Sequence, residues 1–136
     1  MEEDYIVMKE NGIVVKYYEK PGVEDFADEV AKSLPQWAYD LVMLLVISYY
    51  FPEYPDVIRG VAKLAKNDTW NEDIGRKVAD AKVNLKRHER IAKQAAIVKK
   101  ALLRVVDEMD KIIEKHSRKA AAIRDDYNSY YLKKGE

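Results

Sequence analysis

The fold of this chain is decided by residues 70–131, which read WNEDIGRKVADAKVNLKRHERIAKQAAIVKKALLRVVDEMDKIIEKHSRKAAAIRDDYNSYY. The stretch has no proline, and Gly75 is its only glycine. Apolar residues recur in alternating steps of four and three, which is the spacing of one face of an α-helix. This face holds Ile91, Ala95, Val98, Leu102, Val105, Met109 and Ile112. The pattern predicts a long helix or a helical hairpin, against which the preceding residues must pack.

Two irregularities interrupt this spacing. The earlier apolar positions are Ile74, Val78, Ala81 and Leu85. They connect to Ile91 only through two consecutive steps of three, and an extra step of four falls at residues 116–120. Such slips bend a long helix or separate two helices. An unbroken helix would be roughly 85 Å long at about 1.5 Å per residue, so we expect it to fold back at residues 87–90 or to pair with another chain.

The apolar face widens between Val98 and Ile113, where Ala101 and Val106 join it. This width is typical of a helix that faces a core, and it exceeds the narrow seam of a two-stranded coiled coil. We therefore expect this part to pack on the globular body or in the core of an oligomer. The residues predicted to form the helix seam, and a homodimer through it, are Val98, Leu102, Val105, Met109 and Ile112.

The N-terminal part predicts a β-hairpin. Residues 4–10 and 13–19 are rich in strand-forming side chains and flank Asn11-Gly12, the dipeptide favoured in two-residue type I′ turns. Residues 57–64 fit both a helix and a strand, and Gly60 would cost about 1 kcal/mol inside a helix.

Two shorter helices are expected between the hairpin and residue 52. Residues 23–33 form an amphipathic pattern with Phe26, Val30 and Leu34 facing inward, and its acidic residues, Asp25 among them, facing outward. Residues 37–51 are almost wholly apolar and predict a buried central helix, with a buried strand as the alternative for part of them. The predicted fold class is therefore α+β: a hairpin or three-stranded antiparallel sheet, a buried central helix and a long C-terminal helix or helical hairpin.

Length and composition agree with one domain. The 136 residues allow an α+β body over 1–66 followed by the helical segment over 70–131. The chain has no cysteine, its N-terminus is acidic, and its longest uncharged run, residues 41–52, is about half of a bilayer span. We expect no membrane association and a cytoplasmic location, which is the host cytoplasm if the protein is phage-encoded.

Charge is distributed unevenly although the net charge is zero. Residues 1–40 carry ten acidic side chains against four lysines, whereas residues 76–104 carry ten basic side chains against two acidic ones. Seven of these bases lie on or beside one flank of the predicted helix, here called the basic flank: Lys82, Lys86, Arg87, Arg90, Lys93, Lys100 and Arg104. Such a flank could bind phosphates in a salt-dependent way, or it could be a solvated surface neutralised by the acidic N-terminal part.

No residue set has a catalytic signature. His88 and His116 lack ligand-spaced neighbours, and the acidic residues at 107–110 and 125–126 alternate with bases, as on a solvated helix surface. We therefore predict a non-enzymatic protein with no catalytic residues, no metal site and no cofactor. Tyr127, Tyr130 and Tyr131 are large, rigid side chains at the C-terminal end, suited either to docking of the tail or to binding a partner.

Residues 57–80 contain the series GVAK (60–63) and DTWNEDIGRKVA (68–79). This series resembles a theme in small accessory proteins of phages and prophages, in which a short strand is followed by an aspartate, an aromatic residue and a helix carrying glycine and alanine. The resemblance covers about 25 residues. It implies a third strand at 57–64, an origin in a mobile element and action by binding a host protein, as anti-CRISPR inhibitors of defence nucleases do.

Three functions follow as expectations. The leading one is an anti-CRISPR-like interaction protein that binds and inhibits a host protein, such as a nuclease complex that targets nucleic acid. The first alternative is nucleic-acid binding by the basic flank, and the second is a structural helical oligomer held by the seam.

Overall fold

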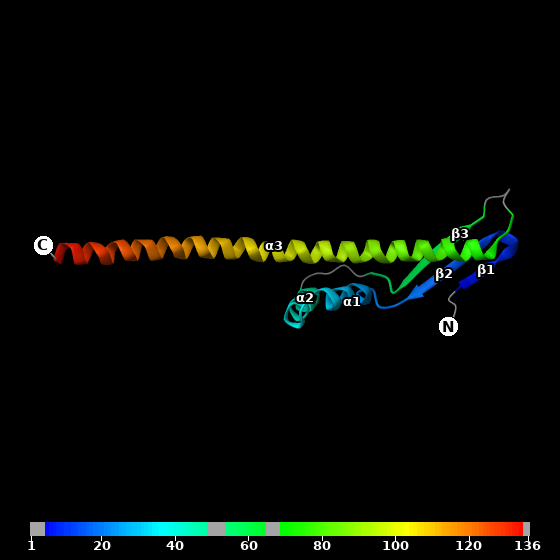
Figure 1. Ribbon diagram of the computed structural model, residues 1–136, viewed down its shortest axis with the longest axis horizontal. Helices are drawn as coiled ribbons and strands as arrows, with labels where there is room; N and C mark the ends of the chain where they lie inside the picture. The colour runs from blue at the N-terminus through cyan, green and yellow to red at the C-terminus, as the bar shows by residue number, and fades with distance from the viewer. Residues whose placement is uncertain (1–4, 49–53, 65–68, 135–136) are drawn as a thin grey trace. The chain divides into compact units, whose positions relative to one another are not determined.

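The computed structural model of the chain describes residues 5–48, 54–64 and 69–134, the last three by their backbone alone. Its elements are β1 (Tyr5–Met8), the 3₁₀ turn η1 (Lys9–Asn11), β2 (Ile13–Glu19), α1 (Glu24–Ser33), α2 (Gln36–Ser48), β3 (Val57–Lys63) and α3 (Glu72–Lys134). The predicted α+β class is confirmed, including the third strand and the long C-terminal helix (Figure 1). No helix within the described ranges is long and apolar enough to cross a membrane.

The chain divides into two compact units, Met1–Val98 and Lys99–Glu136. The first unit holds the sheet, α1, α2 and the N-terminal part of α3. The second unit is the remainder of α3 and the C-terminus. The division therefore falls inside the long helix, and not in the segment before it.

The three strands form one antiparallel sheet in the order β1-β2-β3. The central strand β2 pairs on both sides, so that Val14 stands opposite Val7 in β1 and opposite Ala62 in β3. Burial alternates strictly along β3, where Ile58, Gly60 and Ala62 face inward. In the sequence this segment fitted both a helix and a strand. Its alternating burial shows that it is a strand, because successive side chains of a strand point to opposite faces of the sheet.

The hairpin between β1 and β2 is present, but its turn differs from the prediction. Strand β1 ends at Met8, and a four-residue loop over residues 9–12 closes with a hydrogen bond from the Gly12 N–H to the Lys9 carbonyl oxygen. Only Gly12 has a positive φ, of 64°, whereas a type I′ turn needs positive φ at both central residues. The predicted type I′ turn is therefore wrong, and the glycine serves instead as the left-handed end of a 3₁₀ turn.

The N-terminal part of α3 packs closely against the sheet (Figure 1). A Cβ atom added at Gly75 would stand 2.7 Å from the Val14 Cγ2 atom, and one added at Gly60 would stand 2.9 Å from the Val83 Cγ2 atom. Ala79, Val14 and Ala62 are all buried at this contact. Small side chains therefore bring the helix and the sheet together at short range, which the apolar spacing alone did not indicate.

Helix α3 is continuous through residues 87–90, so the expected fold-back at that point is wrong and the hairpin alternative is not adopted. The helix begins two residues after the first residue of the predicted stretch 70–131. The Ile74 N–H donates to the Asn71 Oδ1 atom at 3.2 Å, so Asn71 caps a helix that begins at Glu72.

The side of α3 that contacts the body is not the side with the largest apolar residues. Its buried positions in the first unit are Gly75, Ala79, Val83, Arg90, Gln94 and Val98. The apolar positions predicted before residue 87 lie about half a turn away and are exposed, with Ile74 at 55% and Leu85 at 59%. Close packing on the sheet requires small residues, so the larger apolar side chains are left on the outer side.

Helix α2 was predicted to be the buried centre of the fold, and this prediction is wrong. Val42 is its only buried residue, whereas Trp37 is 71% and Ile47 is 81% exposed. The helix is apolar on all sides, but α3 already occupies the inner face of the sheet, and α2 contacts mainly α1. Helix α2 therefore presents more apolar surface than the described part of the body covers.

Candidate functional site

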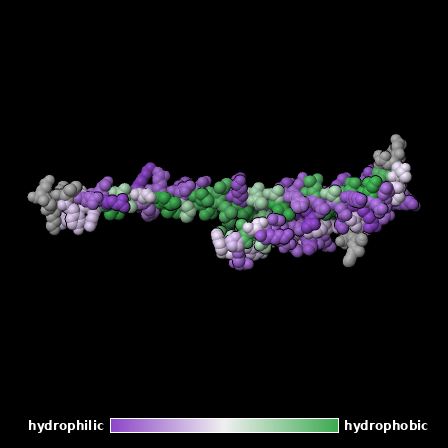
Figure 2. Space-filling model, viewed as in Figure 1, coloured by the Kyte–Doolittle hydropathy of each residue, from purple (hydrophilic) through white to green (hydrophobic). Residues whose placement is uncertain are grey.

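The second unit presents a helix whose large apolar side chains are exposed. Every side chain from Leu103 to Tyr131 is exposed. The large apolar ones are Leu103, Val105, Val106, Met109, Ile112, Ile113, Ile123, Tyr127, Tyr130 and Tyr131. Figure 2 shows hydrophobic side chains gathered along the middle of α3. An exposed apolar face of this kind is a candidate interaction surface. We call residues 103–131 the α3 interaction face.

The predicted seam and tyrosine residues divide between this face and the body. Val98 is buried and Leu102 is half-buried, while Val105, Met109 and Ile112 are exposed. The tyrosines form an aromatic group, because the Tyr127 and Tyr131 rings meet edge to face with centroids 4.7 Å apart. Tyr130 meets Tyr131 in the same manner at 5.9 Å. A hydrogen bond with Tyr131 raises the pKa of the Tyr127 hydroxyl, so Tyr127 stays neutral at physiological pH.

The first bases of the basic flank support the sheet edge. The Lys82 Nζ atom donates to the Val61 carbonyl oxygen at 2.7 Å, and the Lys86 Nζ atom donates to the Arg59 carbonyl oxygen at the same distance. Both acceptors belong to β3, the edge strand of the sheet. Positive side chains over an edge strand hinder its pairing with another chain. These two lysines therefore have a structural role in the body.

Arg87 and Arg90 converge on Asp25 of α1. Arg87 donates to both carboxylate oxygens at 3.1 Å, and Arg90 donates to the Oδ2 atom at 3.4 Å. The Tyr18 hydroxyl in β2 donates to the Oδ1 atom at 2.7 Å, and the Arg87 guanidinium lies 4.0 Å above the Tyr18 ring. Asp25 is only 7% exposed, so its predicted outward orientation is wrong. The Asp25 cluster joins α1, β2 and α3.

The environment of this cluster shifts its pKa values in a consistent way. Burial alone would raise the pKa of the Asp25 carboxyl, but the hydrogen bonds from Arg87 and Tyr18 and the positive charges of Arg87 and Arg90 outweigh it and lower that pKa. Burial and the hydrogen bond to Asp25 raise the pKa of Tyr18 to about 12. Asp25 is therefore ionised and Tyr18 neutral near pH 7, as expected for a structural ion pair.

A second polar contact holds the other edge strand. The Tyr5 hydroxyl in β1 donates to the Asp80 carboxylate of α3, and the Lys16 Nζ atom lies 3.7 Å from the other oxygen of that carboxylate. The hydrogen bond to Asp80, with burial, raises the pKa of Tyr5. Like the Asp25 cluster, this contact fixes a strand to α3 and offers no reactive group.

Three basic-flank residues meet at a groove in the first unit. The groove has a volume of about 540 Å³ between β3, residues 54–55 and α3, and its charged lining residues are Arg59, Lys86, Glu89, Arg90 and Lys93. Lys86 is bonded to the Arg59 carbonyl oxygen, and Arg90 donates to the Pro55 carbonyl oxygen at 2.9 Å. Two of the basic side chains at the groove, Lys86 and Arg90, thus already donate hydrogen bonds within the body.

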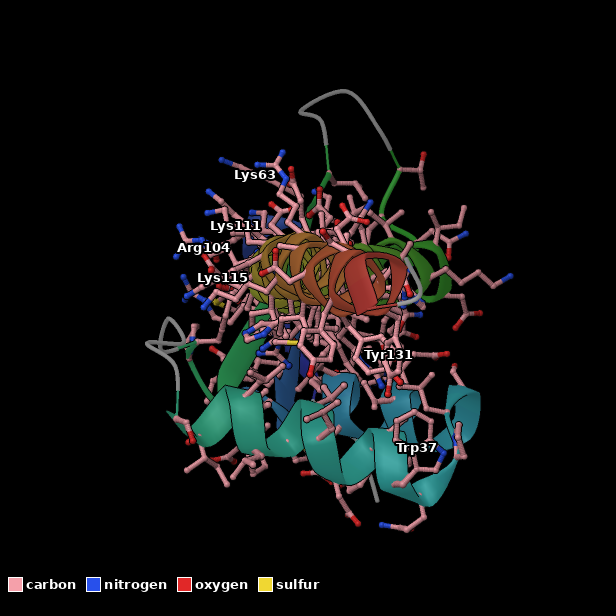
Figure 3. The ribbon with its side chains drawn as sticks, turned by 90° about the vertical axis from the view of Figure 1, so that its left-hand side faces the viewer. Trp37, Lys63, Arg104, Lys111, Lys115 and Tyr131 are labelled. Atoms are coloured by element: carbon pink, nitrogen blue, oxygen red, sulfur yellow. The ribbon has the colours of Figure 1, made fainter. Side chains whose placement is uncertain are left out.

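The remaining bases of the basic flank, Lys93, Lys100 and Arg104, are exposed. Figure 3 shows Arg104 on the same flank of α3 as Lys111 and Lys115. Glu108 and Glu114 carry ion pairs on this stretch, to Lys111 at 3.2 Å and to Arg118 respectively. Positive and negative charges alternate there, as on an ordinary solvated helix surface.

Two further apolar surfaces were not singled out from the sequence. The sheet face turned away from α3 exposes Ile6, Met8, Val57 and Val61 at 36–48%. Helix α2 exposes Trp37, Leu41 and Leu44 on one side. Only the burial pattern of the folded chain shows them, because both segments read as core elements in the sequence. Among the described residues, no group of three or more acidic, histidine or cysteine side chains could hold a metal ion.

A comparison of the chain with protein families, with curated proteins and with solved structures finds no match.

Proposed function

We propose that this chain is a non-enzymatic interaction protein that binds another polypeptide through the α3 interaction face. One observation carries the proposal: Met109, Ile113 and Ile123 are 48%, 62% and 68% exposed on a helix with no covering element among the described residues. Burial of such side chains stabilises a complex by about 1.5–3 kcal/mol each. Leaving them in water has no benefit for the isolated chain.

The resemblance to phage accessory proteins supports a further proposal, namely that the protein inhibits a host nuclease complex. Nucleic-acid binding by the basic flank is less favoured. Lys82, Lys86, Arg87 and Arg90 donate hydrogen bonds to carbonyl or carboxylate oxygens of the body, which reduces the charge available to phosphates.

Replacing two side chains of the face tests the proposal. In Met109→Asp/Ile113→Asp, we expect association to weaken at least about 100-fold, since two buried apolar contacts of roughly 1.5 kcal/mol or more are lost. Lys93→Glu/Lys100→Glu serves as the matched control and should leave protein binding within about threefold of the original, because exposed charges contribute little. Association is measured by light scattering of the purified chain and by affinity capture from a nuclease-treated bacterial lysate.

Two results would contradict the proposal. One is that neither self-association nor a captured protein depends on Met109 and Ile113. The other is that only nucleic acid is recovered, that it dissociates at raised salt, and that the lysine variant loses it, which would make the basic flank the working surface.

A further inference from the structure

A single seven-residue spacing runs through the second unit. Helix α3 continues without a break to Lys134. One line of residues along it keeps alternating steps of four and three residues, also across residues 116–120. It contains Leu102, Val106, Met109, Ile113, His116, Ala120, Ile123, Tyr127 and Tyr130. All of them are exposed except Leu102, which is half-buried. A line with a period of 3.5 residues is typical of the seam of a left-handed coiled coil. A straight α-helix has about 3.6 residues per turn, so such a line keeps facing the partner helix only when the two helices supercoil.

We propose that the α3 interaction face is covered by the same face of a second copy of this chain, running antiparallel, with a two-fold axis near residue 118. This inference rests on the proposed function and names its partner. Residues of the line at equal distances before and after the axis then stand opposite each other in the two copies.

The core layers of this arrangement are complementary in size. Val106 faces the partner's Tyr130, Met109 faces the partner's Tyr127, Ile113 faces the partner's Ile123, and His116 faces the partner's Ala120. Each layer occurs twice because of the two-fold symmetry. The large tyrosines thus meet smaller aliphatic side chains, and the polar His116 meets the smallest residue of the line, where its ring can reach solvent at the rim.

The charges beside the line favour the antiparallel direction. One flank consists of the residues that follow Leu102, Met109, His116, Ile123 and Tyr130, namely Leu103, Asp110, Ser117, Arg124 and Tyr131. In an antiparallel pair this flank faces itself, so Asp110 meets the partner's Arg124, and Leu103 meets the partner's Tyr131. The opposite flank brings Lys119 near the partner's Lys119, which is one like-charge contact against two ion pairs.

A parallel pair is worse on the same counts. The flank of Lys119 would then face the flank of Arg124, which gives two like-charge contacts and no ion pair. It also places His116 against the partner's His116 in the core. The order of the charged residues along α3 therefore favours the antiparallel orientation of the two helices, whereas burial of the apolar line stabilises the pair.

Disulfide cross-linking tests the direction, and the native chain is suited to it because it has no cysteine. In the proposed pair, Ile113→Cys/Ile123→Cys brings a cysteine of one copy opposite a different cysteine of the other. We expect mild oxidation to convert most of this full-length variant into a covalent dimer. Each single variant should stay uncross-linked, since its two cysteines lie about ten residues, roughly 15 Å, apart along the axis, beyond disulfide reach.

Light scattering of the unmodified full-length chain completes the experiment. A mass of two chains, with cross-linking confined to the double variant, would support the antiparallel pair. Cross-linking of the single variants would overturn the direction, because Ile113 meets Ile113 and Ile123 meets Ile123 in a parallel pair. A mass of three or four chains would overturn the two-stranded arrangement.

A monomer at every concentration tested would overturn the second copy as the partner. That outcome is distinct from failure of the proposed function. If a lysate protein is still captured and Met109→Asp/Ile113→Asp releases it, the face binds a different polypeptide. If no capture depends on these residues either, the proposed function fails as well.

Discussion

Asp25→Ala is expected to lower the free energy of unfolding by about 3–5 kcal/mol, the usual loss when one partner of a buried ion pair is removed. The Arg90 side chain is only 6% exposed, and without the carboxylate its charge would be buried with the Pro55 carbonyl oxygen as its remaining hydrogen-bond acceptor among the described residues. Its Nε atom already has no hydrogen-bond partner in the described structure. Tyr18 and Arg87 would lose their acceptor as well.

Urea unfolding followed by circular dichroism measures this loss. Asp28→Ala is the matched control, because Asp28 is an exposed acid on the same helix, and its replacement should change stability by less than about 0.5 kcal/mol. Tyr18→Phe removes one hydrogen bond and should cost about 1 kcal/mol. A loss for Asp25→Ala no larger than that of Asp28→Ala would show that the cluster does not hold α1 on α3.

The acid dependence of the same variant follows from the lowered pKa of Asp25. A carboxyl whose pKa is lower in the folded state stabilises the fold above its ordinary pKa of about 3.9, and this contribution disappears as the pH falls through the folded-state value. The difference between the original chain and Asp25→Ala should therefore be full at pH 7 and shrink below about pH 4.

Gly60→Ala is expected to destabilise the first unit by about 3 kcal/mol, the upper part of the usual range for overpacking. The added Cβ atom would meet the Ala79 carbonyl oxygen well inside van der Waals contact and would lie 3.0 Å from the Val83 backbone nitrogen. Both atoms belong to the α3 backbone, so relief requires the helix to move away from β3. That movement would also separate Ala79 from Val14 and Ala62 in the core.

Two further variants make the experiment specific. Arg59→Ala, at an exposed neighbouring position of the same strand, should cost less than about 1 kcal/mol. Gly60→Ala/Val83→Ala should not recover the stability of the original chain, because the clash with the Ala79 carbonyl oxygen remains. Full recovery in this double variant would mean that side-chain crowding alone, and not backbone contact, makes glycine necessary at residue 60.

Part of the site was accessible from the sequence. Val105, Met109 and Ile112, with Tyr127 and its neighbours, were predicted as a seam or binding surface, and the structure places them on one exposed helix face. Their roles remain predictions, but their placement follows from helical spacing alone. Positions within a single helix depend on local geometry, which the sequence specifies well.

The roles of the bases could not be separated in this way. Lys82 and Lys93 look alike in the sequence, yet Lys82 donates to a carbonyl oxygen of β3 while Lys93 lines a groove. Asp25 looks like its exposed neighbour Asp28, yet it is the buried centre of the Asp25 cluster. Which charge is buried depends on segments that lie up to 65 residues away in the chain.

The α+β class and the existence of the long helix follow from the sequence alone, which also favours the third strand, because periodicity, glycine and proline act over a few residues. The tertiary structure decided which face of α3 meets the sheet, and it placed the small residues Gly75 and Ala79 there. It also decided that α2 is exposed. The physical reason is that packing depends on close fit between distant segments, and an apolar side chain in the sequence carries no information on whether another segment will cover it.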